Sequence, residues 1–214
     1  KMVLQVAAAF VVYRAGVVFA GIYNPFAEKY IFFPEWLKLI LSITWIFGVT
    51  TVINFTDGLD GLAGSLSAIS AVTLFIVALA KGRVESAYMA IALLGSALSY
   101  LHYNKPPAKI YMGDAGATFL GYILGIIALD GALKQATVLS IFIPVLALGV
   151  PIFDNLFVII KRFTEGKPVY KADASQVHFR LLNLGLNAKQ VLVFLCLVNV
   201  CFSLISIILL LLNV

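Results

Sequence analysis

Long runs of apolar residues follow one another through most of the chain, and they constrain its fold more than any other feature. Of its 214 residues 62% are hydrophobic, and the mean hydropathy is +1.04. A helix needs roughly 20 mostly apolar residues to cross a bilayer. The clearest such run is 191–212, where Asn199 and two serines are the polar interruptions. This composition excludes a soluble globular domain and predicts an integral membrane protein.

The apolar runs predict an all-α polytopic membrane protein with about seven transmembrane helices. The polar segments between the runs are too short for a soluble domain, so 1–214 is expected to form a single transmembrane domain. The one long polar stretch, 161–189, is expected to be a loop within it. To within a few residues, the helices are predicted at about 2–23, 37–55, 62–80, 86–103, 117–133, 136–160 and 190–212.

Seven spans place alternate connecting segments on the same side of the membrane. The segments near 55–62, 101–116 and 161–189 therefore share a face with Lys1. That face receives nine Lys and Arg residues and the opposite face five, while Arg14 lies within the first expected span. Because positive residues are enriched in cytoplasmic loops, the face of Lys1 is predicted to be cytoplasmic.

Two short acidic clusters lie between apolar runs on this face. One is Asn54-Phe-Thr-Asp57-Gly-Leu-Asp60-Gly-Leu-Ala63, and the other is Met-Gly-Asp114-Ala-Gly. Carboxylates near lipid are costly and tend to be functional, and flanking glycines let a ligand approach the backbone closely. The clusters predict a site for a hard cation and a phosphorylated substrate. The alternative is that polar residues simply collect in loops.

Each candidate residue also has an ordinary structural explanation. Asp57 and Asp60 can share one side of a helical turn, but either one could merely cap the helix. Asp114 suits a magnesium ion that takes one or two carboxylates with water and phosphate, or it could be a simple turn residue. Tyr111 could stack on a nucleobase or belong to the aromatic belt at the membrane interface.

The 161–189 segment combines positive charge with His178 and Arg180. Because the Arg guanidinium forms paired hydrogen bonds with phosphate, both residues are candidate phosphate contacts. Basic segments beside a membrane also attract lipid head groups, which explains most of the charges in this segment without a catalytic role.

These motifs resemble those of the polyprenyl-phosphate N-acetylhexosamine-1-phosphate transferases, glycosyltransferase family 4. The resemblance rests on the two acidic clusters, on the spacing between them, and on the later Asp173…His178-x-Arg180-Leu-Leu segment, and it covers essentially the whole chain. It implies that a polyprenyl phosphate attacks the β-phosphate of a UDP-amino sugar and releases UMP. Mg²⁺ is the implied cofactor, with Mn²⁺ as the alternative ion.

The resemblance also implies roles for the residues that carry charge. Asp114 resembles the Mg²⁺ ligand, and Asp57 resembles the acid close to the metal and the phosphates. Lys1 is similar to the active-site lysine that opens the corresponding helix. His178 and Arg180 match the His-rich loop that closes over the phosphates and the sugar.

A nucleoside pocket is implied in the same way. Asp60, Asn104 and Tyr111 resemble the positions that hold the uridine, with Tyr111 where the family often has Phe at the base-stacking site. Asn54 resembles a polar residue of the same pocket.

The chain departs from the family pattern in three places. The family carries an adjacent Asp-Asp pair shortly before the position of Lys1, and this chain has none. Since the chain begins with Lys rather than Met, we expect upstream helices that complete a fold of ten to eleven helices. Thr51 replaces an Asn, and the family's His-x-His-His appears as Gln176-Val-His178-Phe179.

The resemblance favours the branch that transfers N-acetylglucosamine-1-phosphate, which starts teichoic acid, O-antigen lipopolysaccharide and related glycans. The expected partners are UDP-N-acetylglucosamine, undecaprenyl phosphate and membrane lipids, with a second copy of the chain as a further candidate and no nucleic acid. The expected location is the bacterial cell (inner) membrane, with a cytoplasmic site. The alternatives are the phospho-N-acetylmuramoyl-pentapeptide transferase branch, an inactive scaffold, or a transporter, which would need polar residues at mid-membrane.

Overall fold

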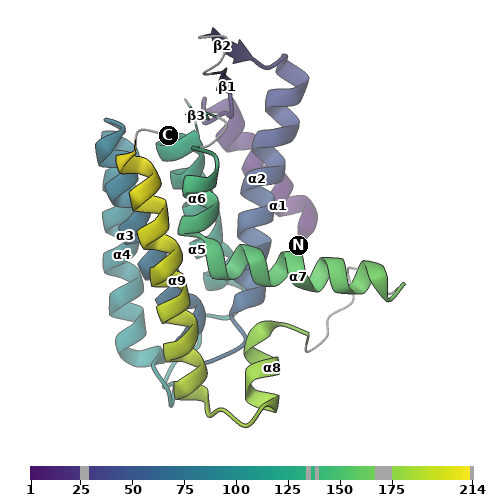
Figure 1. Cartoon of the computed structure of the whole chain (residues 1–214), viewed down its shortest axis with the longest axis vertical. Helices are drawn as coiled ribbons and strands as arrows, with labels where there is room; N and C mark the ends of the chain where they lie inside the picture. Colours follow the sequence, from purple (N-terminus) through teal and green to yellow (C-terminus); the bar gives the residue numbers. More distant parts are fainter. Residues whose placement is uncertain (25–28, 134–135, 138–139, 167–174, 213–214) are drawn as a thin grey trace.

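The computed structural model describes residues 1–24, 29–133, 136–137, 140–166 and 175–212. These residues form a helical bundle with a small sheet at one end, and the connections between several helices gather at the other end (Figure 1). Within them, five helical segments are long and apolar enough to cross a membrane, and a sixth apolar helix is shorter. The prediction of an all-α polytopic membrane protein is confirmed.

The spanning helices correspond closely to five of the expected segments, and the segment expected at 62–80 has the same limits as its helix. The fourth span continues from an α-helix into a π-helix, η1. The helices are α1 Met2–Arg14, α2 Glu35–Thr56, α3 Leu62–Ala80, α4 Val84–Asn104, α5 Gly113–Ala128, η1 Leu129–Leu133 and α9 Ala188–Leu211.

Helix α3 lies inside the bundle, whereas α2, α4 and α9 present most of their surface outward. In the most apolar window of α3, 67% of the residues are buried, against 28% in each of the other three. Helix α3 is rich in Ala, Ser and Gly, and small residues let neighbouring helices in a membrane approach closely. Its composition therefore fits its central position.

Helices α2 and α5 pack at close range, and their packing sets the position of two candidate site residues. A side chain at Gly121 of α5 would collide with the backbone of Thr50 in α2. From this crossing, α2 runs on to Asn54, and α5 runs back to Asp114 at its own first turn. The side chains of Asn54 and Asp114 consequently meet beyond the contact of Gly121 with Thr50.

The predicted helix 2–23 is wrong beyond Arg14, where α1 ends. The chain turns at Gly16, which has a φ of +93° that favours glycine. It then forms the strand β1 Gly21–Asn24, which pairs antiparallel with β2 Lys29–Phe32 and parallel with β3 Ala136–Thr137. This three-stranded sheet is an addition to the all-α expectation.

The predicted helix 136–160 is also wrong as a single element, because the helix is interrupted at Leu148, between α6 Phe142–Ala147 and α7 Gly149–Thr164. Pro151 has no N–H to bond the carbonyl of Ala147. The Ser70 hydroxyl of α3 donates to that carbonyl instead, at 2.6 Å.

Helix α9 stabilises the same break from the other side. The Asn199 side-chain oxygen accepts from the Val150 N–H at 3.1 Å, and Ser206 donates to the Ile143 carbonyl at 2.8 Å. A broken helix at membrane depth needs such partners for its freed backbone groups. The break allows α7 to run across the bundle rather than along it (Figure 1).

Helices α7 and α8 Val177–Asn183 are tied together. Asp154 of α7 accepts a hydrogen bond from the Val177 N–H at 2.8 Å, at the start of α8. The Arg180 guanidinium of α8 lies over the Phe157 ring of α7, 4.5 Å from its centre. These contacts hold α8 below α7, at the end of the bundle opposite the sheet (Figure 1).

Candidate active site

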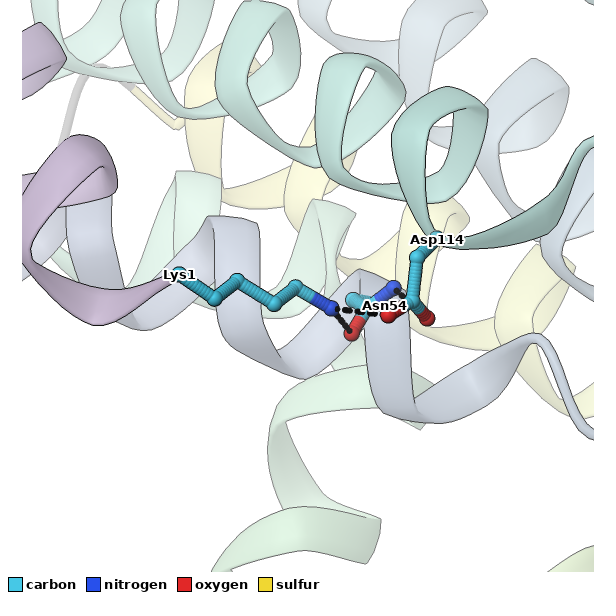
Figure 2. A network of polar contacts seen from close by, with 3 residues as sticks. All are labelled: Lys1, Asn54 and Asp114. Atoms are coloured by element: carbon cyan, nitrogen blue, oxygen red, sulfur yellow. Dashed lines mark hydrogen bonds and ion pairs between the residues drawn. The ribbon is translucent and has the colours of Figure 1, made fainter.

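Three candidate residues from three helices meet at this end of the bundle. The Lys1 ammonium donates to the Asn54 side-chain oxygen and to the Asp114 carboxylate, each at 2.8 Å. The Asn54 amide also donates to Asp114, at 3.4 Å (Figure 2). Lys1 directly precedes α1, Asn54 lies in the last turn of α2, and Asp114 lies in the first turn of α5. The helix ends thus place a cation, an amide and a carboxylate in one cluster.

Asp57 adds a second carboxylate beside this cluster. It caps the C-terminal end of α2 and is half-buried. Burial, and then the negative charge of Asp114, raise the pKa of Asp57 to about 6. The two acids are therefore close enough to repel each other, and a cation between them would relieve that repulsion.

The pair of Asp57 and Asp114 fits a magnesium ion better than a softer metal. Magnesium generally binds one or two carboxylates and completes its shell with water and substrate phosphates. Within the described part of the chain, no three His, Cys, Asp or Glu residues form a group that could hold a metal. Two neighbouring carboxylates suit an ion that shares its ligands with a substrate.

Asp60 and Asn104 are engaged in holding the segment that leads into α5. The Asp60 carboxylate accepts from the Ala108 N–H at 2.9 Å. The buried Asn104 side chain accepts from the Gly61 N–H at 2.9 Å and donates to the Ile110 carbonyl at 2.7 Å. Two of the three residues predicted to hold the uridine, Asp60 and Asn104, thus fix the backbone of this segment, and the third, Tyr111, is 75% exposed.

His178 lies against the acidic turn between α2 and α3. Its imidazole is fully buried, and neither ring nitrogen has a hydrogen-bond partner among the described residues. A side chain on Gly58 would collide with the imidazole Nε2. Burial lowers the pKa of His178 to about 4, so the ring is neutral at pH 7.

Arg180 and Asp173 have different outcomes. The Arg180 guanidinium lies over Phe157 of α7 rather than in the carboxylate cluster. Asp173, which belongs to the segment that carries the family resemblance, lies outside the described residues. The structure therefore brings Lys1, Asn54 and Asp114 into one network, with Asp57 beside it. It places His178 against the adjoining turn and Arg180 of α8 over Phe157 of α7.

Two residues of this region were not among the sequence candidates. Asp154 fixes the start of α8, and the Tyr100 hydroxyl accepts from the Met112 N–H at 3.0 Å, just before α5. Tyr100 stands one helical turn before Asn104, and residues four apart share a helix face. That spacing is the signal that could have identified it.

An open groove of about 440 Å³ begins at the cluster and continues along α1 and α5. Apart from the charged pair at one end, mostly apolar side chains line it. Its lining consists of Lys1, Leu4, Gln5, Ala8, Thr50, Asp114, Ala115, Thr118, Phe119 and Tyr122.

A polytopic helical bundle with carboxylates and a lysine at the end of an apolar groove has the features of an integral membrane enzyme. Residues 1–132 match the family model described as glycosyl transferase family 4. The chain belongs to glycosyl transferase family 4.

Similar proteins carry names from two branches. The chain is 38% identical over 209 residues to the probable undecaprenyl-phosphate N-acetylglucosaminyl 1-phosphate transferase of Bacillus subtilis, covering 98% of this chain and 58% of that protein. It is 30% identical over 215 residues to the decaprenyl-phosphate N-acetylglucosaminephosphotransferase of Mycobacterium leprae, covering 91% and 54%. It is 36% identical over 165 residues to the phospho-N-acetylmuramoyl-pentapeptide-transferase of Symbiobacterium thermophilum, covering 74% and 46%. The chain thus spans about half the length of these relatives.

Proposed function

We propose that the protein transfers N-acetylglucosamine-1-phosphate from UDP-N-acetylglucosamine to undecaprenyl phosphate and releases UMP. The observation that carries this proposal is the cluster of Lys1, Asn54 and Asp114, with Asp57 beside it, at the end of an apolar groove. A lipid phosphate needs such a site, because its head group is anionic and its chain is apolar.

The reaction exchanges one phosphoanhydride bond for another. An oxygen of the lipid phosphate attacks the β-phosphorus of the UDP-sugar, the bond to the bridging oxygen breaks, and UMP leaves with the electron pair. Negative charge is redistributed over the phosphate oxygens during this step. The Lys1 ammonium is placed to stabilise that charge, and Asn54 and Asp114 orient the ammonium through hydrogen bonds.

Asp57 and Asp114 are the residues that would hold Mg²⁺. A bound magnesium ion supplies electrostatic stabilisation to phosphate oxygens and orients them. The neutral imidazole of His178 lies against the turn that follows Asp57, so in this arrangement it contributes shape rather than charge to the site.

The site is proposed to face the cytoplasm, where UDP-sugars are made. The excess of Lys and Arg in the segments expected on the Lys1 face supports this orientation. The fold supports it further, because His178 of α8 contacts Gly58 in the turn that directly follows the end of α2, where Asn54 binds Lys1.

The choice of N-acetylglucosamine rests on the similar proteins. The Bacillus subtilis relative named for this sugar is matched over 98% of the chain, and the relative named for the muramoyl-pentapeptide over 74%. Because both names occur, the muramoyl-pentapeptide donor is the second candidate and must be tested beside the first.

The test is a transfer assay with the full-length protein in mixed micelles of undecaprenyl phosphate. UDP-N-acetylglucosamine and UDP-N-acetylmuramoyl-pentapeptide are supplied separately, with Mg²⁺ or with EDTA. We expect a lipid diphosphate sugar and one equivalent of UMP from the first donor, and no product from Asp114→Asn. Release of UDP would contradict phosphosugar transfer, and turnover with the second donor alone would assign the other branch.

A further inference from the structure

The segment between α4 and α5 is held at alternate residues by three side chains. Asp60 accepts from the Ala108 N–H at 2.9 Å, and Asn104 donates to the Ile110 carbonyl at 2.7 Å. The third bond runs from the Met112 N–H to the Tyr100 hydroxyl, at 3.0 Å. The backbone is therefore fixed at regular intervals up to the residue that caps α5.

The ring of Tyr100 packs close to α3. A side chain on Gly64, in the first turns of α3, would contact the Tyr100 ring at 3.4 Å and would press on Leu101 at 2.9 Å. The glycine thus allows α4 to pack directly on α3. The Tyr100 ring therefore lies beside the start of α3, which directly follows the turn that carries Asp57 and Asp60.

The hydrogen bond to Met112 is adjacent to the point where the chain turns into the site. Gly113 has a φ of +61°, and Asp114 follows it directly. A shift of the Met112 amide would move Asp114 away from Lys1 and Asn54. The position of Asp114 consequently depends on the Tyr100 hydroxyl as well as on its own ion pair.

We propose that Tyr100 is a positioning residue of the transfer site, which aligns Asp114 through the Met112 amide. The proposal rests on the transfer function proposed above and names a residue that acts through its hydroxyl without touching the substrate. Removing the hydroxyl leaves the ring packing in place but leaves the Met112 N–H without its acceptor.

The experiment compares the full-length wild type with Tyr100→Phe and Tyr88→Phe. Tyr88 lies on the same helix, is 69% exposed and serves as the matched control. Hydrogen–deuterium exchange is followed in peptides covering 108–116, and kcat and KM are measured for UDP-N-acetylglucosamine. For Tyr100→Phe we expect exchange at the Met112 amide to be about 3- to 10-fold faster, as for the loss of one hydrogen bond. We expect kcat to fall by a similar factor, with KM unchanged.

Three results would overturn the proposal. One is unchanged exchange at Met112, and another is unchanged kcat in Tyr100→Phe. The third is a higher KM with a normal kcat, which would mean that the hydroxyl binds the donor directly. If the wild type transfers no sugar phosphate, the proposed function fails by itself, and the exchange measurement still decides whether Tyr100 holds the start of α5.

Discussion

The imidazole of His178 lies directly against the backbone of Gly58, with no room for a methyl group between them. This contact joins α8 to the turn that connects α2 and α3, although the two residues are far apart in the sequence. Gly58 lies between the two aspartates of that turn. The residue at position 58 therefore determines how closely α8 can approach the site.

Replacing Gly58 with Ala is expected to displace His178 and α8 from the turn. The added methyl group would overlap the imidazole, and overpacking in a tight contact typically destabilises by about 1–3 kcal/mol. We expect at least a tenfold loss of transfer and faster hydrogen–deuterium exchange in α8. Gly95→Ala is the matched control, because nothing lies within 4 Å of its added methyl group. Normal activity of Gly58→Ala would show that the contact is dispensable.

The buried His178 predicts a loss of stability at acid pH. Its pKa is lowered to about 4 in the folded protein, against about 6.5 for an unfolded histidine. The folded and unfolded states bind protons equally above pH 6.5. As the pH falls from 6.5 to 4, the unfolded state takes up the proton first and folding stability is lost. Thermal melting in detergent at pH 7.5 and pH 5 should therefore show a smaller acid-induced decrease for His178→Gln than for the wild type. Equal decreases would contradict a buried neutral imidazole.

Lys1→Met is expected to reduce kcat strongly. The substitution removes the ammonium that Asn54 and Asp114 hold, and fixed cations contribute several kcal/mol to the stabilisation of phosphate charge. We expect a decrease of about 100-fold, with the protein still folded by thermal melting. Lys29→Met, on strand β2 in the small sheet, is the control. A similar decrease in both variants would indicate a general charge effect rather than a local one.

Tyr111 tests the nucleoside side of the site. The Tyr111 side chain is exposed, near the end of the segment between α4 and α5. If it stacks on uracil, Tyr111→Ala should weaken UDP-sugar binding by about 1–3 kcal/mol, whereas Tyr111→Phe should change it little. Calorimetric titration with UDP-N-acetylglucosamine measures both. Equal affinity of Tyr111→Ala and the wild type for the UDP-sugar would instead assign Tyr111 to the aromatic belt of the membrane interface.

The spanning helices were predictable because each needs roughly 20 mostly apolar residues to cross a bilayer. Helix α3 shows this most clearly, since its expected limits are the observed ones. The break at Leu148 was not predictable from hydropathy, since apolar residues continue from α6 across the break into the first turn of α7. The prolines at 144 and 151 were a usable signal that the apolar pattern concealed. The pairing of β1 with β3 joins segments that are distant in the sequence, and no local pattern encodes it.

The shared location of Lys1, Asn54, Asp57 and Asp114 followed from counting spans. Topology alone places helix ends on one face, and the structure then brings three of these side chains into hydrogen-bond contact. The use of Asp60 and Asn104 as braces for the 105–112 segment could not be predicted, because it depends on backbone groups exposed only in the folded loop.

The wide spacing of the site residues has a consequence for biosynthesis. The ion pair between Lys1 and Asp114 joins residues 113 positions apart, so it cannot form until the ribosome has delivered α5 to the membrane. The contact of His178 with Gly58 must wait for α8. At about 5–20 residues per second, α8 follows the start of α5 by several seconds. The acidic turn between α2 and α3 therefore reaches the membrane before its partners and acquires them one after another, Asp114 with α5 first and His178 with α8 later.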